Sequence, residues 1–184
     1  MRLLPLVLVP LVAAGCGHNP VSYSQPVDVT LPTITQKSVS GANVSVQKNI
    51  NTVSGNPYGA FVNAAVQQLN GKNPSRIAVT SLTLTLLGTS SATGLQQVFG
   101  GPVNVNFVFS GSGTTAPVGQ IGSVSGTSMT LATTFDSRAL SPSDYTSLLQ
   151  GQFDSLLTGP AASGFATSTL SADVKTTFTF VAYE

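Results

Sequence analysis

The sequence predicts a mainly β fold of the α+β class: an antiparallel β-sheet or sandwich with two short amphipathic helices. Three segments, at 103–109, 129–135 and 170–182, alternate apolar and polar side chains with a period of two. This period places alternate side chains on opposite faces of a strand. Strands with a single apolar face are typical of antiparallel sheets, because strands of a parallel sheet covered on both faces would be apolar throughout.

The first segment of interest, residues 17–33, carries three prolines at intervals of six. Proline disfavours helix and stiffens an extended chain, so the segment predicts a tether that reaches at most ~50 Å at ~3.3 Å per residue. The alternation of Val27, Val29 and Leu31 supports a second interpretation, in which these residues form the first strand of the domain. The residues leave both interpretations open.

A short strand and a helix are predicted next. Val44 and Val46 alternate with polar neighbours and mark the strand. Asn56 and Pro57 are typical of a helix N-cap and first turn, and the predicted helix ends at Gly71. Its apolar side chains recur at helical spacing and form one stripe, which consists of Tyr58, Phe61, Val62, Ala65, Val66 and Leu69.

Residues 76–88 change their apolar parity within one segment. Ile77 and Val79 occupy one face of a strand, whereas the leucines of 82–86 occupy the other. Either a β-bulge near residues 80–81 switches the face, or both faces are covered. This segment is therefore the predicted central strand of the sheet.

Two further strands are predicted at 103–109 and 129–135. The stretch between them, 110–128, is rich in glycine and serine. Such a composition predicts either a mobile loop or a loosely patterned hairpin.

The second helix is predicted for residues 141–158. Ser141 can cap it, Pro142 fits its first turn, and Asp144 stands where a capping box has its acid. Gly159 and Pro160 would end it. The apolar stripe consists of Tyr145, Leu148, Leu149, Phe153 and Leu156. The chain then closes with the predicted strand at 170–182, which is long and half-buried.

The chain carries few charges. It has seven Lys and Arg against six Asp and Glu, and only 7% of its residues are charged, where typical soluble domains have roughly 25%. Such a surface cannot neutralise many phosphates, so nucleic acid is not an expected partner. Electrostatic attraction to an acidic membrane is equally unsupported.

The sequence does not predict an enzyme. Catalysis by a serine nucleophile needs a base, usually histidine, and the one histidine, His18, lies ahead of the domain. A glycosidase needs two carboxyl groups ~5–9 Å apart, and Asp136 with Asp154 is the candidate pair. The ordinary explanation of Asp136 is a turn with a local ion pair to Arg138.

Two other acids also have structural explanations. Asp144 is explained by helix capping, and Asp173 faces solvent beside Lys175 if the strand interpretation holds. Zinc sites fail for lack of His and Cys ligands. The chain has neither the Asp-rich loop of a calcium site nor a glycine-rich phosphate loop before a helix. We therefore predict no cofactor and no metal-binding residues.

The one cysteine of the chain, Cys16, follows a short apolar segment. Arg2 precedes the apolar run of residues 3–14, and Gly15 leads directly into the cysteine. The run is shorter than the about 20 residues that span a bilayer, so it is expected to be a targeting segment. An unpaired thiol in an exported protein also needs an explanation.

Residues 1–16 resemble the signal of bacterial lipoproteins, in which the cysteine is acylated and becomes the first residue of the mature chain. The resemblance implies a signal peptide at 1–15 and lipidation of Cys16, with the acyl chains binding the membrane. Gly17 after the cysteine implies the outer membrane, in bacteria that have one. The resemblance to lipoprotein signals implies nothing about the domain that follows. The expected division is thus 1–15 signal peptide, 16–33 acylated cysteine and proline-containing tether, and 34–184 a single β-rich domain.

Two functions are compatible with these features. The first is a non-enzymatic interaction or scaffold subunit of a cell-surface or outer-membrane assembly of the secretion, motility or adhesion type, with an envelope protein as partner. The alternative is a β-sandwich module that binds glycan, peptidoglycan or lipid. Sugar sites usually have exposed aromatic side chains, and with Tyr58 and Tyr145 in the helix stripes only Tyr23 and Tyr183 remain. The oligomeric state is left open.

Overall fold

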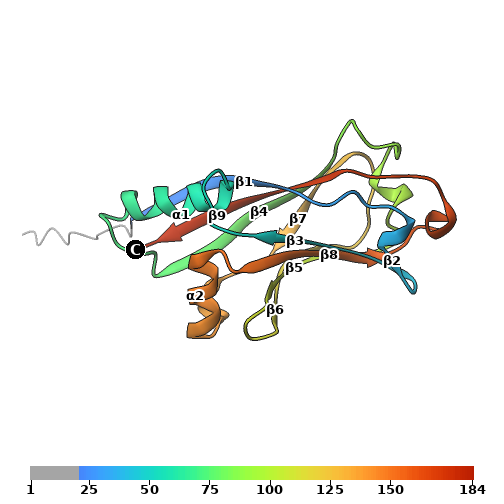
Figure 1. Ribbon diagram of the computed structural model, residues 1–184. Helices are drawn as coiled ribbons and strands as arrows, with labels where there is room; N and C mark the ends of the chain where they lie inside the picture. Colours follow the sequence, from blue (N-terminus) through green and yellow to red (C-terminus); the bar gives the residue numbers. More distant parts are fainter. Residues whose placement is uncertain (1–20) are drawn as a thin grey trace, which may run out of the picture.

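The computed structural model describes residues 21–184, in which nine strands form one curled antiparallel sheet accompanied by two α-helices (Figure 1). The order across the sheet is β1-β9-β4-β7-β6-β5-β8-β3-β2. The predicted mainly β, antiparallel fold with two helices is confirmed. The strands are β1 (Ser22–Thr30), β2 (Val39–Ser40), β3 (Asn43–Ile50), β4 (Arg76–Leu86), β5 (Val103–Phe109), β6 (Thr114–Ile121), β7 (Ser128–Thr133), β8 (Phe153–Pro160) and β9 (Val174–Tyr183).

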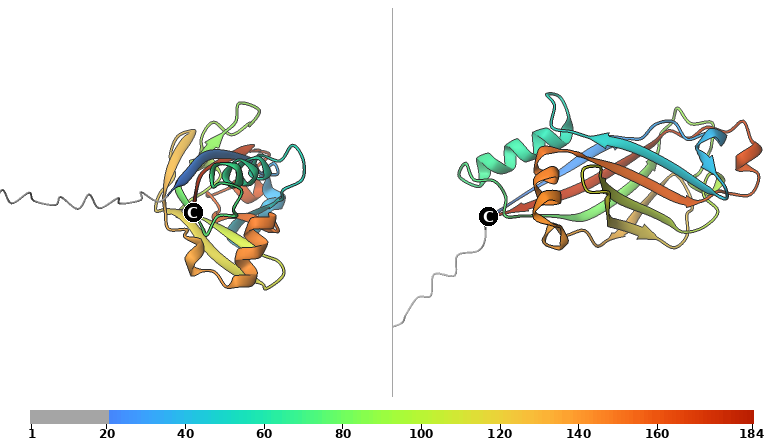
Figure 2. Two further views of the ribbon diagram at one scale, coloured as in Figure 1. Left: turned by 90° about the vertical axis from the view of Figure 1, so that its left-hand side faces the viewer. Right: turned by 60° about the horizontal axis from the view of Figure 1, so that its bottom comes forward.

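The sheet curls into two layers that share one core. Strands β1, β9, β4 and β7 form one layer and β6, β5, β8, β3 and β2 the other, as Figures 1 and 2 show. Phe107 of β5 contacts Phe178 of β9 with ring centroids 5.4 Å apart. Phe153 of β8 lies 5.2 Å from the ring of Tyr58, which in turn lies 5.1 Å from Phe180 of β9. These aromatic contacts join the layers into a sandwich.

The two ends of the sandwich differ. Val21, the first described residue, accepts a backbone hydrogen bond of 3.1 Å from Glu184, so both ends of the described chain lie together. We call this the terminal end; α1 and α2 lie toward it (Figure 2). The opposite end, which we call the loop end, consists of the segments 31–42, 87–102, 122–127 and 161–173.

Strand β1 decides between the two interpretations of residues 17–33. It pairs with β9 over nine positions, from Ser22↔Tyr183 to Thr30↔Lys175. Val27 and Val29 are buried in the core. The tether predicted for 16–33 is therefore wrong from residue 22 onward, and the domain begins before residue 34. The burial of alternate side chains against β9 outweighs the effect of the prolines, because Pro26 needs no backbone N–H on an edge strand.

Of the two alternatives for residues 76–88, strand β4 has the bulge. Its pairing with β9 shifts register between Val79 and Ser81, which places Val79 and Leu82 on the same buried face. It pairs with β9 on one side and β7 on the other, so it is an inner strand.

Helix α1 (Pro57–Gln68) confirms the predicted helix and its start, but it ends at Gln68, before the expected Gly71. Asn56 caps it, since its side chain accepts a 3.0 Å hydrogen bond from the backbone N–H of Tyr58. Tyr58, Phe61 and Ala65 are buried.

The second predicted helix is half wrong. Helix α2 (Pro142–Gln150) begins at Ser141 as expected, but it ends at Gly151, which has φ 65° and ψ 37°. Residues 153–160 then form strand β8, with Phe153 and Leu157 facing the core. The left-handed conformation of Gly151 stops the helix, and pairing with β3 on one side and β5 on the other holds the strand.

The glycine-rich stretch 110–128 forms a hairpin rather than a loop. It contains β6, which pairs with β5 from Phe109↔Thr114 to Val103↔Ile121. The strand predicted at 170–182 begins later than expected, at Val174, with Ala172 joined to Ile34 by a single bridge.

Candidate functional site

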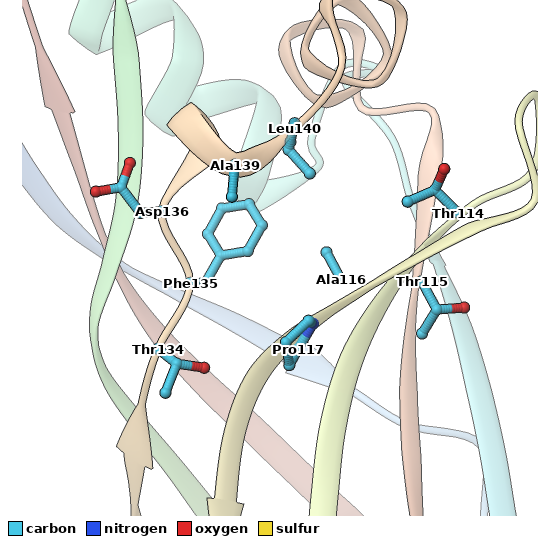
Figure 3. Close-up of a pocket in the computed structure, with 9 residues that line it drawn as sticks. All are labelled: Thr114, Thr115, Ala116, Pro117, Thr134, Phe135, Asp136, Ala139 and Leu140. Atoms are coloured by element: carbon cyan, nitrogen blue, oxygen red, sulfur yellow. The ribbon is translucent and has the colours of Figure 1, made fainter.

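A groove opens where the two layers of the sandwich meet. Strands β6 and β7 pair only at Gly119↔Thr133 and Gln120↔Ala132. Toward the terminal end the two segments diverge after a last hydrogen bond of 3.0 Å from Thr134 N–H to the Val118 oxygen. The resulting space of about 180 Å³ is the seam groove (Figure 3). It is lined by Thr114, Thr115, Ala116, Pro117, Thr134, Phe135, Asp136, Ala139 and Leu140.

One wall of the groove is a free strand edge. Residues Thr114–Pro117 pair with β5 on one side, and within residues 21–184 their backbone has no strand partner on the other. Pro117 fits this position, since proline in sheets is confined to edges and bulges. Thr114, Thr115 and Pro117 are exposed, so the edge is open to solvent.

The opposite wall continues the course of β7 along β4. Phe135 accepts a hydrogen bond of 3.2 Å from Val79 N–H through its backbone oxygen, and Asp136 forms a bridge with Ala78. The Phe135 ring is buried and meets the Phe107 ring edge-on at 4.9 Å. With Ala116 on the facing wall, this gives the groove an apolar floor. Ala139, in the short helix η3 (Ser137–Ala139), and Leu140 close it above (Figure 3).

An ion cluster forms the rim beside Asp136. Its carboxylate accepts from Arg138 Nη2 at 2.7 Å, from the Arg138 backbone N–H at 3.0 Å and from Arg76 Nη2 at 2.7 Å. The hydrogen bonds from the Arg138 side chain, helped by those from its backbone and from Arg76, hold the pKa of Asp136 well below its ordinary value. Two guanidinium groups face one carboxylate, so the rim carries a net positive charge.

The local ion pair of Asp136 with Arg138 is thus confirmed, and Arg76 is an addition that sequence reasoning missed. Arg76 lies 60 residues earlier, at the start of β4, and its guanidinium also covers the Tyr183 ring at 4.4 Å. No local sequence pattern predicts a contact between residues 60 positions apart. The local feature that could have indicated the groove is Pro117, because proline in a sheet is confined to edge strands and bulges.

Asp154 lies elsewhere, in a polar network on the other layer. Its carboxylate accepts from Gln47 Nε2 at 2.8 Å, from Asn49 Nδ2 at 2.9 Å and from the Ser110 hydroxyl at 3.3 Å. Asp136 and Asp154 belong to different layers and share no hydrogen-bond partner. The structure therefore assigns each carboxylate a separate structural environment rather than bringing them together as a pair.

The other acids also accept hydrogen bonds from neighbouring side chains. The Ser141 hydroxyl accepts from Asp144 N–H at 3.2 Å, as expected of an N-cap, but the Asp144 carboxylate accepts from the hydroxyls of Ser112 and Ser141 at 2.6 and 2.8 Å. Asp173 is half-buried and accepts from Thr33 and Thr89, at 2.6 Å each.

The expected neighbour of Asp173, Lys175, is ion-paired elsewhere. Its ammonium lies 2.9 Å from the Asp28 carboxylate. Residues 21–184 contain no group of three or more His, Cys, Asp or Glu side chains that could hold a metal ion.

The tyrosines do not form an exposed cluster. Tyr58 is fully buried, Tyr23 stacks on Phe61 at 6.1 Å, and the Tyr145 hydroxyl donates to the backbone oxygen of Pro74. Within residues 21–184 no aromatic side chain is exposed. Cys16 and His18 lie outside the described residues, as does the signal predicted for 1–15.

A second hollow lies at the loop end. It encloses about 450 Å³ between the segment around Gln96 and the turn at 162–170. Across the four loop-end segments, Lys37 and Asp173 are the only charged residues. We call it the loop-end hollow; its lining consists of Gln96, Gln97, Ala162, Ser163, Gly164, Phe165, Ser168 and Leu170.

Sequence comparison does not assign this chain to a family. No family model matches it, and no curated protein matches its sequence. A solved structure of Desmodium yellow mottle tymovirus is similar at 12% identity and a TM-score of 0.32, over 100% of this chain and 96% of that one. A similarity at that TM-score gives no basis for assigning a function. Among the described residues, none of the helices has the length and apolar character to cross a membrane.

Proposed function

We propose that this protein is a lipid-anchored, non-enzymatic interaction subunit of a bacterial envelope assembly of the secretion, motility or adhesion type. In this proposal acyl chains on Cys16 bind the outer membrane, and the domain binds an envelope protein. The observation that supports partner binding is the seam groove, where the free β6 edge lies above an apolar floor. An extended segment of another protein can add to such an edge as a strand.

The short connection to Cys16 supports a function near the membrane. Four residues separate Cys16 from Val21, so an acylated cysteine lies at most about 17 Å from the domain, over five steps of ~3.4 Å each. This is far less than the ~50 Å expected of a tether through residue 33. The terminal end would then lie close to the bilayer surface.

The seam groove lies on the same side of the domain as this connection. Ser22, next to Val21, pairs with Tyr183, and Tyr183 pairs with Arg76, which contacts Asp136 at the groove. Three strand spacings of ~4.8 Å place Asp136 about 14 Å across the sheet from Ser22. A partner at the groove would thus be one that reaches the same bilayer surface.

The test is partner capture from cross-linked cell envelopes with variants matched in size and setting. Ala139→Trp fills the groove from its rim, and Ala166→Trp is its control, because both alanines are exposed and lie in short 3-10 helices. We expect the same envelope protein with the wild type and Ala166→Trp, and its loss with Ala139→Trp. Capture of that protein by Ala139→Trp contradicts the groove as the binding site.

Membrane attachment is tested separately with Cys16→Ala. We expect the wild type to float with membranes and to carry the mass of the acyl groups, and Cys16→Ala to remain in the aqueous fraction. A wild-type protein with a free thiol at Cys16 would contradict the lipid anchor.

The loop-end hollow supports a second candidate function, the binding of glycan or peptidoglycan. Its volume of about 450 Å³ falls within the roughly 300–1,000 Å³ of small-molecule sites. The amides of Gln96 and Gln97 and the hydroxyl of Ser163 are neutral donors and acceptors that suit sugar hydroxyls. Co-sedimentation with purified peptidoglycan tests it, with Gln96→Ala as the variant expected to reduce binding and Gln152→Ala as an exposed control.

A further inference from the structure

The dimensions of the seam groove suit one side chain rather than a small molecule. Its volume is about 180 Å³, below the roughly 300–1,000 Å³ of small-molecule sites. Phe135 and Ala116 make its floor apolar, and the neutral Thr114 and Thr115 flank it on β6. An apolar side chain buried there would serve as the central anchor that dominates many interfaces.

The free edge of β6 determines the conformation of what enters. Residues Thr114–Pro117 are paired on one side only, so an extended segment can extend the sheet with backbone hydrogen bonds. Alternate side chains of such a segment point to the same face. One of them would therefore enter the groove, and residues two positions away would lie along its rim.

The charges at the rim are unequal. Arg138 has an exposed fraction of 69% at its side chain, whereas Arg76 has 30% and is stacked on Tyr183. Asp136 can neutralise only one of these two guanidinium groups. Arg138 makes most of the side-chain hydrogen bonds to Asp136, but it is the more accessible of the two cations, so an added anion meets the excess positive charge most easily there.

The end of the groove beside Thr114 is acidic, in contrast to the basic end beside Arg138. The Ser112 hydroxyl donates to the Asp144 carboxylate at 2.6 Å and lies 2.9 Å from the Thr114 hydroxyl. Among the described residues Asp144 forms no ion pair. An acidic side chain is favoured beside Arg138 and disfavoured beside Thr114, which gives a bound segment one orientation.

We propose that the seam groove binds an extended segment of a partner protein, which places an apolar side chain in the groove and an acidic side chain against Arg138. This inference rests on the proposed function, since it states the chemistry of the partner at the same site. It names the class of segment that is recognised: a strand with an apolar residue and an aspartate or glutamate within two positions of it.

The experiment is selection of random nonapeptides displayed on phage against the purified acylated protein in detergent micelles. We expect enriched peptides to contain the apolar and acidic pair. Synthetic copies should bind the wild type and Ala166→Trp equally and Ala139→Trp not at all. Binding should also slow hydrogen exchange of the backbone N–H groups in Thr114–Ala116.

The role of the acidic side chain in the bound peptide is tested by replacing each of two exposed, ion-paired cations of the protein. Arg138→Gln should weaken binding about two- to fivefold, the range expected of an exposed ion pair, and should abolish the preference for Asp or Glu over Asn or Gln. Lys72→Gln is the control, because Lys72 lies toward the terminal end, is 67% exposed and is also ion-paired. It should leave binding unchanged.

Three outcomes overturn the inference: no enriched peptide, enriched peptides that still bind Ala139→Trp, or a preference for acid that persists in Arg138→Gln. If the peptide experiment fails but the groove-dependent capture of an envelope partner succeeds, the proposed apolar and acidic recognition is wrong and the proposed function remains. A free Cys16 thiol removes the lipid anchor, and the peptide result is unaffected.

Discussion

The Tyr58 hydroxyl on α1 donates a hydrogen bond of 3.0 Å to the backbone oxygen of Leu148 on α2, across 90 residues of sequence. The Tyr58 ring also contacts Phe153 and Phe180 in the two layers. This one side chain therefore connects both helices to the core. Its deep burial raises the pKa of its hydroxyl far above the ordinary value, so the folded protein excludes the phenolate.

Tyr58→Phe is expected to lower the free energy of unfolding by about 1 kcal/mol at pH 7, the usual net contribution of one hydrogen bond. The Leu148 oxygen keeps a second donor, since Gly151 N–H lies 3.1 Å away, so no buried acceptor is left alone. Urea unfolding of the variant and wild type measures the difference. A loss of several kcal/mol would show that the hydroxyl has a larger role than this.

The same tyrosine predicts alkaline instability. Above its ordinary pKa of about 10, Tyr58 of the unfolded chain loses its proton while that of the folded chain keeps it. The unfolded state then binds fewer protons, so stability falls as pH rises above about 10. Urea unfolding between pH 8 and 11 should show a shallower fall for Tyr58→Phe; an identical fall contradicts the assignment to Tyr58.

Asp136 predicts that the stability of the fold decreases at low pH. Its pKa is lowered in the fold, first by hydrogen bonds from Arg138, so its stabilisation is present above the unfolded pKa of about 3.9 and is lost as pH falls further. Asp136→Asn should therefore destabilise by on the order of 1 kcal/mol at pH 7. The gap from the wild type should close toward pH 2. Asp28→Asn, at a more exposed ion pair, is the control with a smaller expected effect.

Removal of the hydroxyl is predicted to affect stability differently at two buried positions in the core. Ser155 has the one buried side-chain polar atom without a hydrogen-bond partner in the region 21–184, whereas the Thr176 hydroxyl donates to the Val29 oxygen at 3.1 Å. Burying an unpaired hydroxyl is unfavourable by about 1–3 kcal/mol. Ser155→Ala should thus leave the melting temperature unchanged or raise it, and Thr176→Val should lower it. A clear loss in Ser155→Ala would mean that its hydroxyl has a partner.

Gly119 permits the close approach of β6 and β7 at the seam. A Cβ built there would lie 2.8 Å from Leu82 Cδ2 and 3.0 Å from the Ala132 oxygen. Gly119→Ala is therefore expected to destabilise by about 1–3 kcal/mol through overpacking. Gly122→Ala is the matched control, because nothing lies within 4 Å of its Cβ. Equal melting temperatures for the two variants would show that the seam can relax.

Lengthening the connection between Cys16 and Val21 tests whether the groove acts near the membrane. A flexible insert of about 20 Gly and Ser residues adds roughly 25 Å of mean reach and dilutes the groove at the bilayer surface. Cross-linking to a membrane-held partner should fall, while binding of selected soluble peptides should not change. Cross-linking that is unaffected by the insert would place the partner away from the membrane.

Local sequence patterns determined most of the strands and the starts of both helices, and they left the bulge in β4 as one of two alternatives. The alternation over residues 174–183 and 103–109 predicted their buried faces, and Asn56 and Ser141 predicted the two helix caps. These features depend on residues a few positions apart, so the sequence displays them directly.

Contacts between distant segments decided the rest. Residues 153–160 have apolar side chains that suit either a helix or a strand, and only pairing with β3 and β5 selects the strand. Strand β1 forms because β9, some 150 residues later, buries its valines. The seam groove arises where β6 and β7 diverge and where Arg76 meets Asp136, because side chains far apart in sequence are brought together only when the two layers close around a common core.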